Sequence, residues 1–231
     1  MFSVPNRINN FRFETFSTKE PETLEWIDSI PQGSVLWDIG ANIGLHSCYA
    51  AKARGCKVFA FEPSAFNLEQ LVRNIFLNKM MRQAVIIPFP LSENLSLNTL
   101  NMASTEWRAA KSTFGENYGC DGQPLDKIFE FQTVGLSMMD AVELLKTPQP
   151  DYIKMDVDGI EHLILKGGST LLQNIKGILI EIDEGFEQQS VDSTQRLRNT
   201  DLELKEKRQS EMFKDSNYKT VYNQIWYRLS K

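Results

Sequence analysis

The sequence predicts a doubly wound α/β fold with a mostly parallel sheet, and three observations support this. Short apolar runs alternate with amphipathic helical patterns along the chain. Most runs are rich in Val, Ile and Phe with little polar alternation, which is typical of strands covered on both faces. No repeat, low-complexity stretch or Gly/Ser linker divides the 231 residues, so we expect one domain over residues 1–231. The expected strands cover residues 35–39, 57–61, 84–89, 152–157, 177–182 and 224–229.

Helical patterns fill the intervals between these strands. The clearest covers residues 67–78, where apolar side chains recur at i, i+3, i+4, i+7 and i+8 and form a core-facing stripe. The pattern at 161–166 ends at two consecutive glycines, which commonly terminate helices. The remaining expected helices cover residues 23–30, 42–53, 138–146 and 191–199.

Two segments do not fit this alternation. Residues 1–33 read as an added strand and helix ahead of the first core strand. Residues 97–131 lack clear periodicity and hold Gly115, Gly119 and Gly122. Because ligands of doubly wound sheets bind at the carboxyl ends of the strands, we expect residues 97–131 to be an insertion over the active site, serving as a lid.

Composition and charge exclude several classes of function. Twenty-five basic against thirty acidic side chains give a formal charge of -5, which disfavours nucleic-acid binding. No apolar run approaches the ~20 residues that cross a bilayer, and residues 1–16 are too polar for a signal peptide, so we expect a cytoplasmic protein without a membrane span. Three cysteines without C-x-x-C spacing indicate neither a disulfide framework nor a zinc site. The composition leaves a homo-oligomer open.

The sharpest motif lies between the first expected strand and the helix after it. It reads Asp38-Ile-Gly40-Ala-Asn42-Ile-Gly44. Glycines at such a turn adopt positive φ and let the backbone approach a ligand. A dinucleotide-binding G-x-G-x-x-G would need glycine where this chain has Asn42 and Leu45, which counts against a nicotinamide-dependent oxidoreductase. A carboxylate at Asp38 repels a pyrophosphate but suits a positively charged ligand.

A second carboxylate, Glu62, ends the second strand 22 residues after Gly40. A carboxylate at this place can accept hydrogen bonds from both hydroxyls of a ribose. Together with the first loop it indicates a pocket for a nucleoside with a cationic tail and no phosphate, and S-adenosylmethionine is such a molecule. The alternative is that Asp38 caps the following helix and Glu62 is solvated.

The fourth strand ends in a cluster of acids where a doubly wound fold binds substrate. Carboxylates suit an oxygen nucleophile, because a weakly acidic hydroxyl needs a base to remove its proton. We expect Asp156 to be that base, with Glu161 and His162 as alternatives or orienting partners. Asp158 and Glu161 could instead cap the next helix or complement its dipole.

Metal chemistry is a lesser alternative at this cluster. Three acids within six residues could hold Mg²⁺, but no second segment supplies further ligands, so a site without metal is favoured. A further acid, Glu181, interrupts the apolar run 177–182. A charge there is costly unless it reaches the cleft or is paired.

These motifs resemble the FkbM family of S-adenosylmethionine-dependent methyltransferases over about residues 21–182, with a looser fit at 223–228. The resemblance implies a class I, Rossmann-like methyltransferase with a seven-stranded sheet and an antiparallel last strand. One departure is Asp158, where the family more often has Glu. The motifs are VLWDIGANIG at residues 35–44, FAFEPS at 59–64 and YIKMDVDGIE at 152–161.

The resemblance also implies a function. Family members O-methylate hydroxyls of sugars or other small molecules and release S-adenosylhomocysteine, and short bacterial forms that open with EPETL, as residues 20–24 do here, resemble enzymes of surface-polysaccharide synthesis. A sugar O-methyltransferase is therefore expected, with a non-sugar hydroxyl acceptor as the alternative. A nicotinamide-dependent oxidoreductase and a noncatalytic adenosyl-binding protein are less favoured alternative functions. The implied cofactor contacts are Asp38, Gly40, Asn42, Gly44 and Glu62, with Leu91 and Ser92 flanking adenine.

Overall fold

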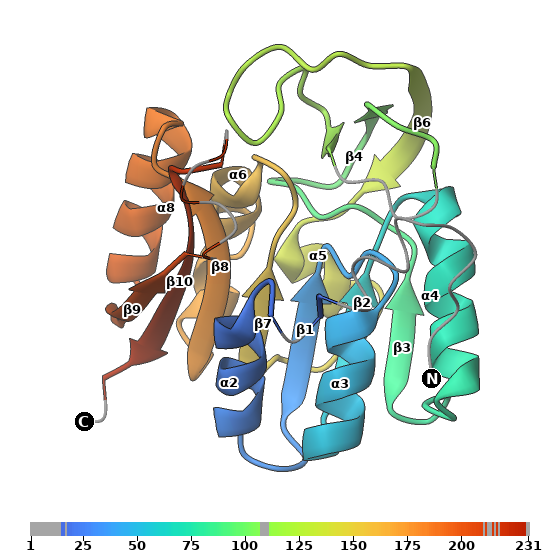
Figure 1. The fold of residues 1–231 in the computed structure, drawn as a ribbon, viewed down its shortest axis with the longest axis vertical. Helices are drawn as coiled ribbons and strands as arrows, with labels where there is room; N and C mark the ends of the chain where they lie inside the picture. The colour runs from blue at the N-terminus through green and yellow to red at the C-terminus, as the bar shows by residue number, and fades with distance from the viewer. Residues whose placement is uncertain are drawn as a thin grey trace.

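A seven-stranded sheet forms the centre of the computed structural model, which describes residues 15–16, 18–106, 111–209, 211, 214, 216 and 218–229 (Figure 1). The strand order is β3-β2-β1-β7-β8-β10-β9. All neighbouring strands are parallel except at β10, which is antiparallel to both β8 and β9. This confirms the predicted fold class, including its antiparallel last strand. The strands are β1 Val35–Ile39, β2 Lys57–Phe61, β3 Ala84–Ile87, β7 Tyr152–Met155, β8 Gly177–Asp183, β9 Leu202–Arg208 and β10 Val221–Arg228.

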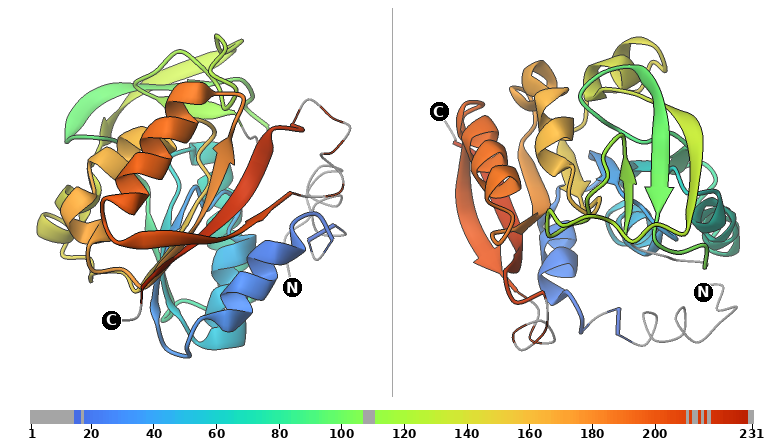
Figure 2. Two further views of the ribbon diagram at one scale, coloured as in Figure 1. Left: turned by 90° about the vertical axis from the view of Figure 1, so that its left-hand side faces the viewer. Right: turned by 90° about the horizontal axis from the view of Figure 1, so that it is seen from above.

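Helices cover both faces of this sheet (Figures 1 and 2). Successive strand residues enter different cores, as Leu36 packs with α2, α3 and α4 while Trp37 packs with α5 to α8. The two-sided burial explains why the central strands read as apolar runs without alternation. The helices are α2 Pro21–Ser29, α3 Leu45–Arg54, α4 Ala65–Leu77, α5 Met138–Glu143, α6 Glu161–Lys166, α7 Ser169–Leu172 and α8 Glu187–Arg198.

The structure differs from the expected elements where local pattern is a poor guide. Helix α3 begins at Leu45 rather than at residue 42, because Asn42 and Gly44 have φ of 52° and 78°, which no right-handed helix accepts. Strand β9 was not expected. Its outer residues are mostly charged and exposed, as in many edge strands, so it shows no apolar run. The strand expected ahead of α2 falls largely outside the described residues.

Residues 97–131, expected to be an insertion, belong to a second sheet. It contains β4 Ser96–Met102, β5 Ser112–Phe114 and β6 Phe129–Gly135 in the antiparallel order β5-β4-β6. The sheet lies beyond the carboxyl ends of the central strands, at the top of Figure 1. Leu100 and Phe114 are buried in the same core as Trp37 of β1, so the small sheet is packed on the large one.

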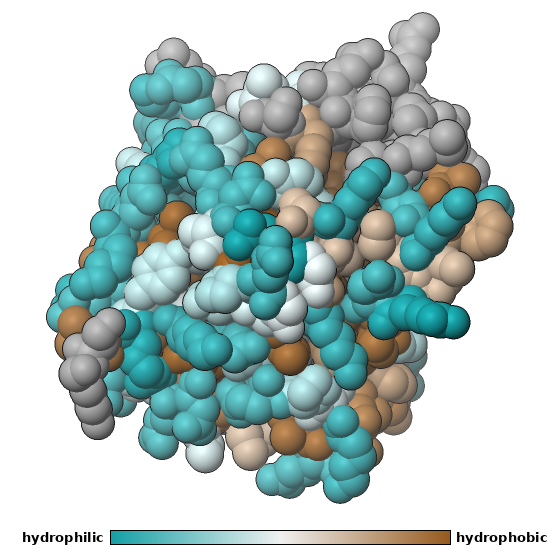
Figure 3. Space-filling view, turned by 90° about the horizontal axis from the view of Figure 1, so that it is seen from below, coloured by the Kyte–Doolittle hydropathy of each residue, from teal (hydrophilic) through white to brown (hydrophobic). Residues whose placement is uncertain are grey.

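The opposite end of the strands presents a different surface. Hydrophilic side chains cover most of that face, with apolar ones scattered between them (Figure 3). Among the described residues, no helix combines the length and apolar character that a membrane crossing requires.

Gly40, which follows β1, lies against Asp156, which follows β7. We predict that Gly40→Ala markedly lowers the free energy of unfolding. A Cβ at this position would lie 1.8 Å from the carbonyl oxygen of Asp156. Gly33→Ala is the matched control, because Gly33 has nearly the same φ, 76° against 77°, but no atom within 4 Å of such a Cβ. Urea unfolding should show a loss of about 1–2 kcal/mol for Gly33→Ala, which reports backbone strain alone, and a clearly larger loss for Gly40→Ala. Equal losses would mean that the two strand ends separate easily.

Candidate functional site

The β1–α3 loop is tied to the strands beside it by backbone hydrogen bonds. The amides of Gly40 and Ala41 both donate to the carbonyl of Phe61 at 3.0 Å, and the amide of Asp156 donates to the carbonyl of Ile39 at 3.0 Å. The loops that follow β1, β2 and β7 therefore meet at one place. This is where the strand order reverses, and doubly wound sheets bind their ligands at such a point.

Asp38 lies beneath this loop and is only 1% exposed. Its Oδ2 accepts a hydrogen bond from the Ser47 hydroxyl at 2.5 Å, and its Oδ1 is 3.7 Å from the Lys154 ammonium. Gly44, not Asp38, occupies the N-cap position of α3. Asp38 thus holds the first turn of α3 through Ser47 and lines neither of the cavities described below.

Glu62 is likewise buried, at 4% exposure, rather than solvated. Its Oε2 accepts from the Asn42 amide at 2.8 Å, and its Oε1 accepts from the Ser64 amide at 2.9 Å and from Asn67 Nδ2 at 3.3 Å. Burial raises the pKa of Glu62 to about 7, although these hydrogen bonds oppose the rise. The carboxyl group thereby fixes Asn42 in its left-handed conformation.

Two cavities open on either side of this junction. The smaller has a volume of about 60 Å³, with Glu62 and Asn67 as polar groups and Leu91 in its apolar wall. The larger has a volume of about 240 Å³. Both are lined by Gly40, Asn42, Asp156 and Asp158, so the two cavities form one site along the strand ends.

Besides Asp38, two further residues expected to contact a cofactor, Gly44 and Ser92, line neither cavity. The amide of Ser92 donates to the carbonyl of Leu136, and its hydroxyl donates to the carbonyl of Asn94 at 3.0 Å. Gly44 packs α3 against α4, since a Cβ there would lie 2.3 Å from a methyl carbon of Leu71.

Lys154 is the central charge of the larger cavity. It is 3% exposed, and its Nζ lies 3.2 Å from Oδ2 of Asp156 and 3.7 Å from Oδ1 of Asp38. Burial lowers the pKa of Lys154, but the two carboxylates outweigh burial and the net shift is upward. Lys154 is therefore a fixed cation between β1 and β7.

Of the three acid–base candidates, the structure brings only Asp156 to the cavity. One third of its side chain is exposed. Glu161 is 1% exposed and accepts hydrogen bonds from the Val157 amide at 3.0 Å, the Gly159 amide at 3.1 Å and the Gln189 side chain. His162 is also 1% exposed, and its ring lies 5.9 Å from that of Phe186.

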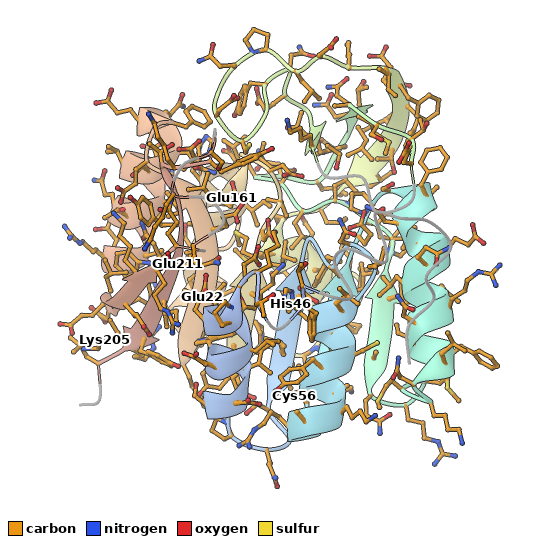
Figure 4. The ribbon with its side chains drawn as sticks, viewed as in Figure 1. Glu22, His46, Cys56, Glu161, Lys205 and Glu211 are labelled. Atoms are coloured by element: carbon orange, nitrogen blue, oxygen red, sulfur yellow. The ribbon has the colours of Figure 1, made fainter. Side chains whose placement is uncertain are left out.

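Glu161 and His162 therefore line neither cavity. Figure 4 shows Glu161 beside α6 and β8, whereas His46 lies at the start of α3. Burial raises the pKa of Glu161 to about 7. In this position Glu161 holds the β7–α6 loop, in which Asp158 has a φ of 63° and accepts from the Lys111 amide at 2.7 Å.

Other cavity residues carry weak sequence signals. Glu20 immediately precedes α2 and pairs with Lys19, which is a common arrangement at a helix start. His46 lines the cavity, and burial together with Lys154 lowers its pKa to about 4, so its ring is neutral near pH 7. Glu181 does reach the cleft, the first of the two arrangements expected for it. No local pattern distinguishes Lys111, Cys120 or Tyr218.

We find no group of three or more His, Cys, Asp and Glu side chains, within the described part of the chain, that is arranged to hold a metal ion.

Comparison with known proteins adds the following. A family model described as the methyltransferase FkbM domain matches residues 38–210. Among curated proteins, the hexuronic acid methyltransferase AglP of Haloferax volcanii is 27% identical over 165 residues, which are 71% of this chain and 62% of that protein. The chain thus spans less than two thirds of this relative's length.

Solved structures share the fold at low sequence identity. Methyltransferase FkbM of Methylobacillus flagellatus has a TM-score of 0.58 at 15% identity, covering 86% of this chain and 44% of that one. An rRNA methylase of Streptococcus thermophilus has a TM-score of 0.55 at 10% identity, covering 99% of this chain and all of that one. Sp1610 of Streptococcus pneumoniae, solved with S-adenosyl-L-methionine, has a TM-score of 0.53 at 13% identity, covering 91% and 74%.

We predict that Glu161→Ala destabilises the fold. The substitution leaves the amides of Val157 and Gly159 and the Gln189 side chain without their acceptor, at about 1–3 kcal/mol for each buried donor that stays unsatisfied. The control is Glu143→Ala on α5, where the side chain is exposed and the change should stay within about 0.5 kcal/mol. Urea unfolding measures both free energies, and equal values would refute a structural role for Glu161.

Proposed function

The chain belongs to the FkbM methyltransferase family, and from this premise we propose that it transfers a methyl group from S-adenosylmethionine to a hydroxyl of a sugar. The observation that carries the proposal is the pair of cavities that share Gly40, Asn42 and Asp156. One cavity is bordered by the ribose-binding candidate Glu62, and the other holds charged groups suited to an acceptor. The relative named a hexuronic acid methyltransferase supports a sugar acceptor, and we place the reaction in polysaccharide synthesis.

The smaller cavity offers an acceptor for a ribose hydroxyl and an apolar wall for a base. Glu62 already accepts three hydrogen bonds, and a carboxylate can accept about four, so one ribose hydroxyl can still donate to it. Leu91 and Pro90 offer an apolar wall for a flat base. When bound, S-adenosylmethionine would supply an electrophilic methyl group, and Asp156, which lines both cavities, would offer a carboxylate to its cationic end.

Asp156 is the base that we propose for the acceptor hydroxyl. Its carboxylate borders both cavities, and the Lys154 ammonium beside it favours the ionised form. The hydroxyl proton passes to an oxygen of Asp156 as that hydroxyl becomes a nucleophile. Because Glu161 is held by backbone amides, it serves to position the loop that carries Asp156.

The cofactor assignment predicts selective stabilisation by a nucleoside without phosphate. S-adenosylhomocysteine at 100 times its Kd should stabilise the protein by about 2.7 kcal/mol, seen as a rise in Tm, whereas NAD should leave Tm unchanged. Differential scanning fluorimetry measures both. A rise with NAD and none with S-adenosylhomocysteine would instead support a nicotinamide-dependent oxidoreductase. Binding without transfer to any acceptor would favour a noncatalytic adenosyl-binding protein.

The base assignment predicts a loss of turnover without a loss of binding. Asp156→Asn should lower kcat by about 100-fold or more, because an amide cannot take up the hydroxyl proton. The increase in Tm caused by S-adenosylhomocysteine should stay close to that of the unaltered protein, which controls for folding and cofactor binding. Radiolabelled methyl transfer measures kcat, and near-normal turnover would exclude Asp156 as the base.

A further inference from the structure

Glu181 lies at the carboxyl end of β8, next to the end of β7 that leads to Asp156 (Figure 1). In the parallel register Lys154 pairs with Leu179 and Met155 with Ile180, so Asp156 and Glu181 occupy the next positions on the two chains. Neighbouring strands are about 4.8 Å apart, and residues two apart on a strand share a face. Both side chains line the larger cavity, which places two carboxyl groups side by side on its wall.

The two carboxyl groups have different partners. Asp156 is paired with the buried Lys154 ammonium at 3.2 Å. Glu181 is part-buried, and within the described residues no hydrogen bond or ion pair is formed by its carboxyl group. A buried carboxyl group without a cation favours its neutral form, whereas one beside a cation favours its ionised form.

The net effect of the surroundings of Glu181 favours its neutral form. Burial contributes most to raising the pKa of Glu181 well above its usual range, followed by the negative charges of Asp156 and Glu20. The Lys19 ammonium opposes this rise in pKa, but its effect is smaller than that of Asp156 or Glu20. The titratable and charged groups that line the cavity with Glu181 come from the segment before α2, the start of α3, β7 and the loop after it, the segments around Lys111 and Cys120, and the stretch before β10. They are Lys19, Glu20, His46, Lys111, Cys120, Lys154, Asp156, Asp158 and Tyr218.

We propose that Glu181 and Asp156 form an acid–carboxylate pair that binds two neighbouring hydroxyl groups of the acceptor. The protonated carboxyl of Glu181 donates a hydrogen bond to one acceptor oxygen, while Asp156 accepts the proton of the adjacent hydroxyl. This inference rests on the proposed function, because it concerns the acceptor of that reaction. It defines the acceptor as a vicinal diol, the arrangement found around a sugar ring, rather than as an isolated alcohol.

The opposite protonation of the two groups accounts for this selectivity. Two carboxylates would both require hydrogen-bond donors and would repel each other. A protonated carboxyl group can instead donate to one acceptor oxygen while the carboxylate accepts from the hydroxyl on the next oxygen. An acceptor that lacks the second oxygen leaves the Glu181 hydroxyl without a partner, and sites built to hydrogen-bond a substrate group discriminate strongly against analogues without it. Glu181 is therefore a specificity-determining residue, and Asp156 remains the base.

Protonation of Glu181 can be tested without an acceptor. The infrared difference spectrum between the unaltered protein and Glu181→Gln, recorded at pH 7 with S-adenosylhomocysteine bound, should contain the carbonyl stretch of a protonated carboxyl group. A carboxylate band in its place would overturn the proposal. The Tm shift with S-adenosylhomocysteine is recorded on the same samples, so loss of the proposed cofactor is seen separately.

Acceptor recognition is tested by methyl transfer to a panel of hexoses and hexuronic acids, each compared with its deoxy analogue. Glu181→Ala should raise KM tenfold or more while lowering kcat less. Glu181→Gln, which keeps a donor, should raise KM about threefold. The exposed Glu143→Gln serves as the control for an unaffected protein.

The dependence of kcat/KM on pH distinguishes acceptor binding by Glu181 from a purely structural role, because a structural role would not change it. In the unaltered protein kcat/KM should fall as pH rises and Glu181 loses its proton, and this alkaline fall should disappear in Glu181→Gln. A kcat that vanishes in Glu181→Gln at unchanged KM would make Glu181 the base and overturn the proposal. Equal transfer to diols and their deoxy analogues would also overturn it, while leaving the proposed function intact. Failure to methylate any sugar would overturn both.

Discussion

The buried ammonium of Lys154 between Asp38 and Asp156 is the interaction on which the rest of the site depends. Lys154 and Asp38 are register partners on β7 and β1, the two strands between which the order of the sheet reverses. Carboxylates gather there because each neighbouring strand or loop contributes one, and burying them together without a cation would be strongly unfavourable. The Lys154 ammonium compensates both carboxylates, that of Asp38 beneath the loop and that of Asp156 at the edge of the cavity.

Two other buried acids hold the backbone of the loops around the site. Glu62 accepts the amide of Asn42, and Glu161 accepts the amides of Val157 and Gly159, so each carboxyl group fixes a loop with left-handed residues. Such conformations cost energy and persist only where the surroundings hold them. The two loops meet at Gly40, which leaves too little space for any Cβ. The shape of the site therefore depends on Glu62, which lines the smaller cavity, and on Glu161, which lines neither cavity.

The parts of the fold that could be predicted from the sequence are those with a local sequence pattern. The central strands are covered on both faces and read as apolar runs, and the loop from Asp38 to Gly44 is recognisable by its glycines between a strand and a helix. Strand β9 could not be predicted, because its exposed edge carries no apolar pattern. The start of α3 was also placed wrongly, because the positive φ of Asn42 excludes it from a helix despite the helix-favouring composition. The direction of Glu161 could not be predicted, because a residue at a helix start can face either the loop or the solvent. Glu181 could be singled out because it interrupts an apolar run, but its position near Glu20 arises only through the tertiary fold, so no spacing along the chain predicts it.

The small sheet of β4, β5 and β6 shares its hydrophobic interior with the central sheet, and the Lys111 amide beside it binds Asp158. The small sheet and the loop that carries Asp158 are therefore packed and hydrogen-bonded to the central sheet as one body. In evolutionary terms, we expect the small sheet to be a poor module for exchange between relatives, because a graft would need apolar faces that match those of β1, β2 and β7.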